Sequence, residues 1–134
     1  MSKYYGDIFE DDTIELTFNT FDSGGASITV TDLVAGDVEI YKDGVVQTTA
    51  GSGVTITLNI GTNNGSHLIS IDTSNTTDAG FYEVGHNYEA RLNGITVDTQ
   101  TINAFIGSFS IENRFSQVDI ALDDAGVNKF LKNG

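Results

Sequence analysis

Apolar and polar residues alternate along several short stretches of the chain. Every second residue is apolar in residues 14–18 and 54–60, and residues 105–111 follow the same pattern if Gly107 is counted with the apolar side. Successive side chains of a β-strand point to opposite faces of a sheet. The alternation therefore predicts strands with one buried face and one solvated face.

Turn-forming residues separate these stretches at short and even spacing. Asp43-Gly44 and Asn93-Gly94 each stand between two such runs, which is the strongest local signal for a two-residue β-hairpin. Eight or nine short strands in about 110 residues are typical of an antiparallel two-sheet sandwich. No segment before residue 115 has convincing helical periodicity, so we do not expect a parallel α/β fold. The predicted strands cover residues 13–20, 27–30, 37–42, 45–48, 54–60, 67–73, 87–92, 95–102 and 105–111.

The end of the chain has a different pattern. Residues 116–122 could form one more strand, and residues 123–126 could cap a short helix that carries Val127, Phe130 and Leu131 on one side. Such a helix is too short to be stable alone, so its apolar side needs a covering surface. Two alternatives stay open: this segment docks on the core of its own domain, or it is an arm that grips another subunit.

The length and composition suit one domain. A chain of 134 residues with 39% hydrophobic residues can build one core rather than two. We expect an all-β sandwich over residues 13–115, preceded by an N-terminal lead-in at residues 1–12. A C-terminal arm or short helix at residues 116–134 completes the chain.

The chain is strongly acidic, with 19 acidic residues, 6 basic residues and a formal charge of −13. Phosphate backbones and anionic membrane surfaces attract clustered Lys and Arg, so we expect neither nucleic acid nor a membrane as partner. The charge fits either a very soluble protein or a protein that docks on a basic surface. The N-terminus has no apolar signal core, and the apolar runs are too short to span a membrane. We therefore expect synthesis in the cytoplasm, and no disulfides because cysteine is absent.

Candidate catalytic residues are few. A nucleophile triad needs a histidine beside an acid and an activated Ser or Thr. The two histidines are His67, which opens a predicted strand, and His86, which lies in a predicted turn. We predict His67 to be a surface or strand-end residue. The sequence has no nucleophile-elbow, phosphate-loop or dinucleotide-binding motif, and we predict that the protein is not an enzyme.

Asp72 and Asp78 are weak candidates for metal ligands. They enclose a loop of oxygen-bearing residues, which a calcium ion accepts, but the loop lacks the central glycine and terminal glutamate of an EF-hand. Aspartates at strand ends commonly cap turns instead. We therefore predict no metal and no cofactor. For a sugar site, Tyr41 and Tyr82 are the candidate exposed aromatics, and tryptophan is absent.

Four segments together resemble a known group of proteins. They are residues 15–30, 37–44, 78–88 and 109–115. In order and spacing they are similar to small structural proteins of tailed phages and prophages, in outline like the immunoglobulin-like N-terminal module of phage baseplate upper proteins. The resemblance covers about residues 8–115 and implies an immunoglobulin-like antiparallel β-sandwich with a C-terminal extension. The residues from Ser116 onward depart from the group.

One of these segments also has a direct physical interpretation. Asp78-Ala79-Gly80-Phe81-Tyr82 resembles the start of strand F in immunoglobulin domains, where a tyrosine hydroxyl bonds to upstream backbone in a tyrosine corner. Either Tyr82 or Tyr88 could make this contact. The usual cysteine two residues after the tyrosine is replaced by Val84, so packing alone would hold this part of the core.

The resemblance implies a virion structural protein. Our first hypothesis is a capsid decoration, or cement, protein that sits on the capsid surface of the virion and binds the major capsid protein lattice and copies of itself. The alternatives are a baseplate or tail-fibre adaptor and a carbohydrate-binding module on the particle surface. Large apolar side chains outside the predicted strands are the expected interface residues: Tyr4, Tyr5, Ile8, Phe9, Phe130 and Leu131.

Overall fold

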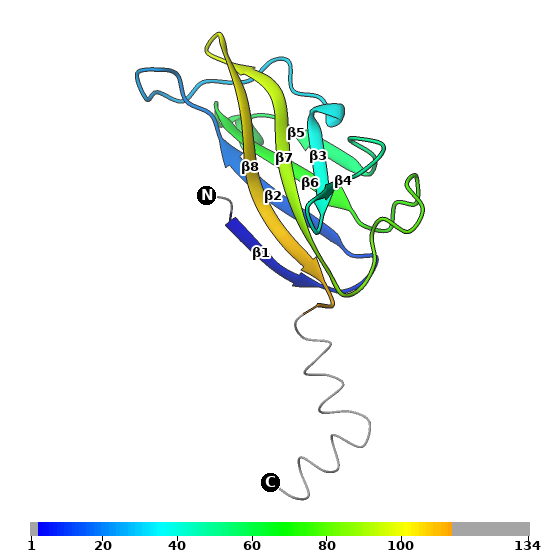
Figure 1. Cartoon of the computed structure of the whole chain (residues 1–134). Coiled ribbons are helices and arrows are strands. Elements are labelled where there is room, and N and C mark those ends of the chain that lie inside the picture. The colour runs from blue at the N-terminus through cyan, green and yellow to red at the C-terminus, as the bar shows by residue number, and fades with distance from the viewer. Residues whose placement is uncertain (1–2, 114–134) are drawn as a thin grey trace, which may run out of the picture.

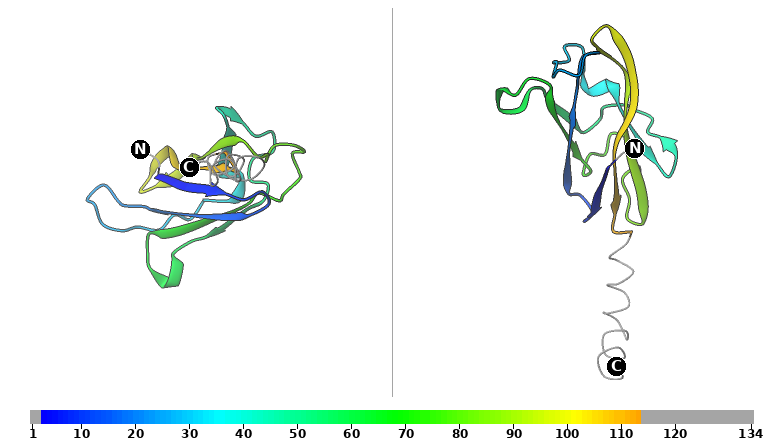
Figure 2. Two further views of the ribbon diagram at one scale, coloured as in Figure 1. Left: turned by 90° about the horizontal axis from the view of Figure 1, so that it is seen from below. Right: turned by 90° about the vertical axis from the view of Figure 1, so that its left-hand side faces the viewer.

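Two β-sheets pack face to face in the computed structural model, which describes residues 3–113 (Figures 1 and 2). The strands, in chain order, are β1 (Lys3–Ile8), β2 (Thr13–Asn19), β3 (Val38–Lys42), β4 (Val45–Val46), β5 (Val54–Thr57), β6 (Ser66–Asp72), β7 (His86–Val97) and β8 (Gln100–Ile111). Two single-turn 3₁₀ helices, η1 (Ala35–Asp37) and η2 (Ile60–Thr62), lie in the connections.

The strand order is that of an immunoglobulin-like sandwich. One sheet has the order β1-β8-β7-β3-β4, and the other has the order β2-β6-β5. The neighbours β8-β7-β3 and β2-β6-β5 correspond to strands G-F-C and B-E-D of immunoglobulin domains. The predicted all-β sandwich is therefore confirmed. One pair departs from the antiparallel rule, because β1 runs parallel to β8.

The sandwich begins earlier than the sequence predicts. Residues 3–8, expected as part of a lead-in, form β1, which pairs with β8 from Gly107 to Ile111. The Tyr5 hydroxyl donates to the Thr17 carbonyl oxygen at 3.0 Å and accepts from the Thr17 amide at 3.0 Å. Tyr5 thereby ties β1 of one sheet to β2 of the other.

The predicted hairpin at Asn93-Gly94 is wrong. β7 continues through both residues to Val97, and the chain turns at Asp98-Thr99, whose φ angles are 48° and 63°. Gly94 is an extra residue in the ladder, which pairs Asn93 with Asn103 and then Ile95 with Ile102. This register buries Ile95 and Val97 in the core, and that burial outweighs the local turn preference.

Three other predicted strands are absent or shorter than expected, and the one predicted at residues 54–60 ends at Thr57 as β5. Residues 27–30 form no strand, and a single bridge joins Ser27 to Phe21. The run predicted at residues 45–48 pairs only at Val45–Val46, although its Asp43-Gly44 turn is confirmed.

Both sheets contribute to one apolar core. Tyr88 and Phe109 are fully buried at its centre, and their rings stack at 5.2 Å with an interplanar angle of 14°. Gly107 leaves room for the Leu16 side chain of the other sheet, because a Cβ there would fall 2.2 Å from a methyl carbon of Leu16. Any other residue at position 107 would force the side chains of Leu16 and Tyr5, or β8 itself, to move.

Candidate functional site

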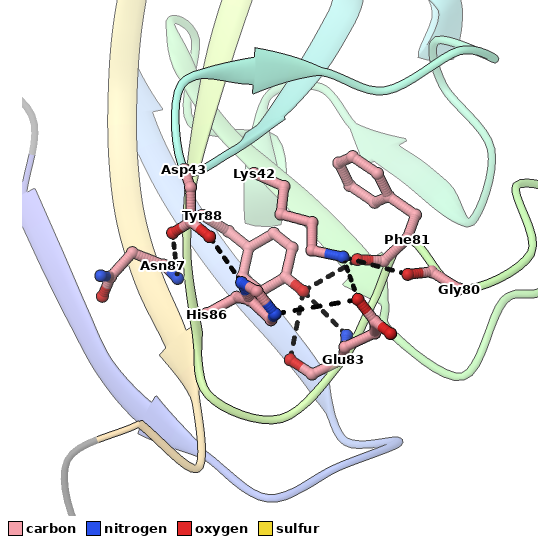
Figure 3. Close-up of polar contacts among 8 residues, drawn as sticks. All are labelled: Lys42, Asp43, Gly80, Phe81, Glu83, His86, Asn87 and Tyr88. Atoms are coloured by element: carbon pink, nitrogen blue, oxygen red, sulfur yellow. Dashed lines mark hydrogen bonds and ion pairs between the residues drawn. The ribbon is translucent and has the colours of Figure 1, made fainter.

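Four charged or titratable side chains meet beside the β3–β4 turn, and we call them the turn cluster: Lys42, Asp43, Glu83 and His86 (Figure 3). His86 Nδ1 lies 2.5 Å from Asp43 Oδ2, and His86 Nε2 lies 3.8 Å from Glu83 Oε1. Lys42 forms an ion pair with Glu83 and donates from Nζ to the Gly80 carbonyl oxygen at 3.0 Å. The cluster joins the end of β3 to the loop that precedes β7.

The two carboxylates of the turn cluster are held in the ionised form. The hydrogen bond from His86 lowers the pKa of Asp43, and the Asn87 backbone N–H adds to this effect. The neighbouring Lys42 ammonium lowers the pKa of Glu83. Because each ring nitrogen of His86 faces one of these carboxylates, the geometry fixes the imidazole as a structural cross-link between Asp43 and Glu83.

Tyr88 forms the tyrosine corner. Its hydroxyl donates to the Phe81 carbonyl oxygen at 2.9 Å and accepts from the Glu83 amide at 2.8 Å (Figure 3). Burial raises the pKa of Tyr88 to about 12, so the hydroxyl stays protonated. Tyr82, the other candidate for the tyrosine corner, packs edge-on against Phe81 at 5.0 Å instead. Its hydroxyl is buried beside the Gln47 side chain, but within residues 3–113 no group meets it in good hydrogen-bond geometry.

His67 is the second residue of β6, so its predicted place at a strand end is confirmed, but it does not lie at the surface. Its side chain is fully buried, with Nε2 2.9 Å from Thr20 Oγ1. Nδ1 accepts from the Asn59 backbone N–H at 3.2 Å, which assigns the ring proton to Nε2. Burial lowers the pKa of His67. A neutral ring so enclosed stabilises the end of the sandwich near Phe18 and is not open to a substrate.

Asp72 and Asp78 each cap a separate turn. Asp72 Oδ1 accepts from the Ser74 hydroxyl at 2.6 Å and the Ser74 amide at 2.9 Å. Asp78 accepts from the Thr49 amide and hydroxyl, both at 2.8 Å. These hydrogen bonds lower the pKa of both carboxyl groups. Within residues 3–113, no three His, Cys, Asp or Glu side chains gather as a metal site would require.

The predicted interface residues near the N-terminus occupy different positions. Tyr5 and Ile8 pack against the core, whereas Tyr4 and Phe9 are 43% and 62% exposed. The Tyr4 hydroxyl is also bonded to the Ser110 hydroxyl at 2.7 Å. The other two predicted interface residues, Phe130 and Leu131, lie outside the described residues.

An apolar groove of about 230 Å³ opens between the two sheets at the end opposite the turn cluster. We call it the edge groove. Its floor includes the buried side chains of Leu92, Ile95 and Val97 from β7, and its rims are the end of β2 and the first half of β8. The remaining lining residues are Phe18, Asn19, Thr20, Phe21, Ile102, Ala104 and Ile106.

The edge groove lies beside an open strand edge. β1 pairs with β8 only from Gly107 onward, so Gln100–Ile106 pairs with β7 alone among the described strands (Figure 1). Ile102, Ala104 and Ile106 point into the groove and are only half-buried. The groove therefore combines apolar side-chain space with backbone groups that can accept another strand.

The edge groove could not be predicted from the sequence, because the groove depends on which strands are neighbours in the sheets. The false hairpin at Asn93-Gly94 split β7 and hid the length of the β7–β8 pair. One signal was available but was not specific: residues 100–106 contain no charged side chain, and the same is true of residues 44–66.

Comparisons with known proteins give no relative. No protein-family model, no curated protein and no solved structure matches the chain. Within residues 3–113, no helix has the length and apolar character that a membrane crossing demands.

Proposed function

We propose that this protein is a non-catalytic structural component of a tailed-phage particle, and specifically a decoration protein on the capsid surface. It would be made in the host cytoplasm and bind the major capsid protein lattice and copies of itself. The edge groove beside the open half of β8 carries the proposal, because an apolar groove with a free strand edge recognises an extended segment of another chain.

The assignment to a phage particle is supported by the sequence resemblance of residues 8–115. A sandwich with strongly acidic turns suits a protein displayed in many copies, since the charge opposes uncontrolled contact between mature particles. Many identical contacts on a lattice also make individually weak interfaces strong in sum. Tyr4 and Phe9 are further exposed apolar side chains that suit such contacts.

The test uses particles assembled from the genome that encodes the chain. Tagged full-length protein is mixed with purified particles lacking it, and co-sedimentation, copy number and electron microscopy are recorded. A head decoration protein should bind in hundreds of copies, whereas a baseplate or fibre adaptor binds in roughly tens or fewer, as particle symmetry dictates. Absence of binding to any part of the particle would contradict the proposal.

A second candidate function has one specific observation in its favour. Tyr41 of β3 and Phe105 of β8 form an edge-on ring pair at 5.5 Å, and Phe105 is 44% exposed. Exposed rings on one sheet can bind sugars, so a carbohydrate-binding module is the alternative. Binding of the purified protein to a glycan array, lost in Phe105→Ala, would favour this alternative over the capsid role.

A further inference from the structure

We propose that the edge groove is filled by residues 116–122 of a second copy of this chain, which adds a strand to the open half of β8. This inference deepens the proposed assembly role by naming one partner segment. Its test uses the isolated protein, so it stands or falls independently of binding to a capsid.

The pattern of residues 116–122 fits the groove. Val118, Ile120 and Leu122 alternate with Gln117, Asp119 and Ala121, so an extended chain presents three aliphatic side chains on one face. The segment has the same length as the open edge, Gln100–Ile106. In strand addition, backbone hydrogen bonds give affinity and alternate side chains fill the adjoining pocket.

Charge favours a contact made through the C-terminal residues over a contact between two folded bodies. Residues 114–134 hold three basic residues, Arg114, Lys129 and Lys132, and three acidic residues. The entire formal charge of −13 therefore belongs to residues 1–113. Two such bodies repel each other, whereas residues 114–134, which have no net formal charge, can approach a neighbouring body at an uncharged edge such as Gln100–Ile106.

The geometry selects a second copy rather than the same chain. Ser116 follows Ile111 by five residues, and Ile106 precedes Ile111 by five residues. A chain that turned back would need full extension along β8, about 17 Å, to bring Ser116 beside Ile106. β1 already occupies that path, because it pairs with Gly107–Ile111. The segment of another molecule has no such constraint.

Cysteine cross-linking tests this assignment, because the natural chain has no cysteine. Full-length Ala104→Cys/Ile120→Cys places one thiol in the edge groove and one in the middle of the proposed strand. Under mild oxidation we expect disulfide-linked dimers or higher multimers. The matched control, Ala104→Cys/Ala121→Cys, moves the second thiol to the opposite strand face and should cross-link at least tenfold more slowly.

Sedimentation of the full chain provides the second measurement. Ile120→Asp should weaken self-association at least tenfold, whereas Ala121→Asp adds the same charge on the opposite face and should change it less than threefold. Intramolecular cross-linking would overturn the choice of a second copy. Equal cross-linking rates of the two cysteine pairs, equal self-association of the two aspartate variants, or a strictly monomeric wild type would overturn the proposal. Self-association without binding to particles would instead leave this inference intact and remove the capsid role.

Discussion

Many acidic side chains in this protein act as acceptors for backbone N–H groups in turns. Asp22 Oδ1 accepts from the amides of Gly24 and Ala26, and Asp98 Oδ2 accepts from the amide of Ser23. Such contacts replace the hydrogen bonds that turn residues cannot make within a sheet. Part of the acidic composition is therefore explained by turn structure. The other carboxylates with this role are Asp7, Asp37, Asp72, Asp78 and Glu112. Asp32 and Asp43 instead accept from the amides of Thr96 and Asn87 in β7.

The two tyrosines near the turn cluster should respond oppositely to loss of the hydroxyl. Tyr88→Phe removes the hydroxyl that accepts from the Glu83 amide and donates to the Phe81 carbonyl oxygen. The free energy of unfolding should therefore fall by about 1–3 kcal/mol. Tyr82→Phe removes a buried hydroxyl that lacks a partner among the described residues, so stability should be unchanged or higher. Urea denaturation of both variants compares them. A larger loss in Tyr82→Phe than in Tyr88→Phe would contradict this assignment.

His67 should make stability depend on pH. Burial lowers its pKa in the folded state, whereas an unfolded chain has an ordinary histidine pKa of about 6.5. Below pH 6.5 the unfolded state therefore binds a proton that the folded state excludes, and stability falls as pH decreases. The slope from one such group is at most about 1.4 kcal/mol per pH unit.

Two variants isolate this effect in denaturation curves recorded between pH 7.5 and 5.5. His67→Gln should be less stable than wild type at pH 7.5, because hydrogen bonds to Thr20 and Asn59 are lost, but its stability should decline less as pH falls. Tyr82→Phe leaves both histidines in place and should retain the wild-type decline. An unchanged slope in His67→Gln would show that another group controls this pH range.

At the scale of elements, alternation predicted the strands whose two faces have different environments. Strand β2 and strand β6 lie where residues 13–20 and 67–73 were expected, because their inner side chains are buried and their outer ones solvated. Strand β1 was not predicted, since Gly6 and Asp7 interrupt any apolar alternation. It forms because the edge of β8 and the contacts of Tyr5 hold it.

The candidate site was less predictable than the strands. The edge groove depends on where β1 stops along β8, and the sequence pattern does not encode which strands are neighbours. The turn cluster brings together Asp43 and His86, which are far apart in sequence and are joined by the pairing of β3 with β7. Individual turns were predictable only where the local preference agrees with the register, as at Asp43-Gly44.

Substitutions at the true turn and at the bulge of the β7–β8 hairpin should therefore change the free energy of unfolding in opposite directions. Thr99 has a β-branched side chain at φ 63°, so Thr99→Gly should raise the free energy of unfolding by about 0.5–1 kcal/mol. Gly94 has φ 73° and open space around its Cβ position, so Gly94→Ala should lower it by about 1 kcal/mol through the backbone alone. Thermal unfolding of both variants tests this. Stabilisation by Gly94→Ala would contradict the positive φ of Gly94 at this bulge.

At the scale of the whole molecule, charge and shape act together. Residues 1–113 contain 16 acidic and three basic residues, so the folded body is surrounded by a negative field. Lys42–Glu83 and Arg91–Glu39 are ion pairs within this body, and both are at least partly exposed. Exposed pairs contribute about 0–1 kcal/mol each, so repulsion among the remaining carboxylates dominates the electrostatic free energy. The uncharged edge of β8 is then a place where another chain meets little repulsion.

This balance predicts the direction of the salt effect on folding. Raising NaCl from about 10 mM to 0.5 M shortens the screening length from roughly 30 Å to below 8 Å and so weakens the repulsion. It also weakens the two ion pairs, but these are fewer and smaller contributions. The thermal midpoint at pH 7 should rise by about 3–6 °C, which corresponds to about 1 kcal/mol for a domain of this size. At pH 4, where many carboxylates are protonated, the same addition should shift the midpoint less. A fall in the midpoint at pH 7 would mean that the ion pairs, rather than the net charge, determine the electrostatic part of stability.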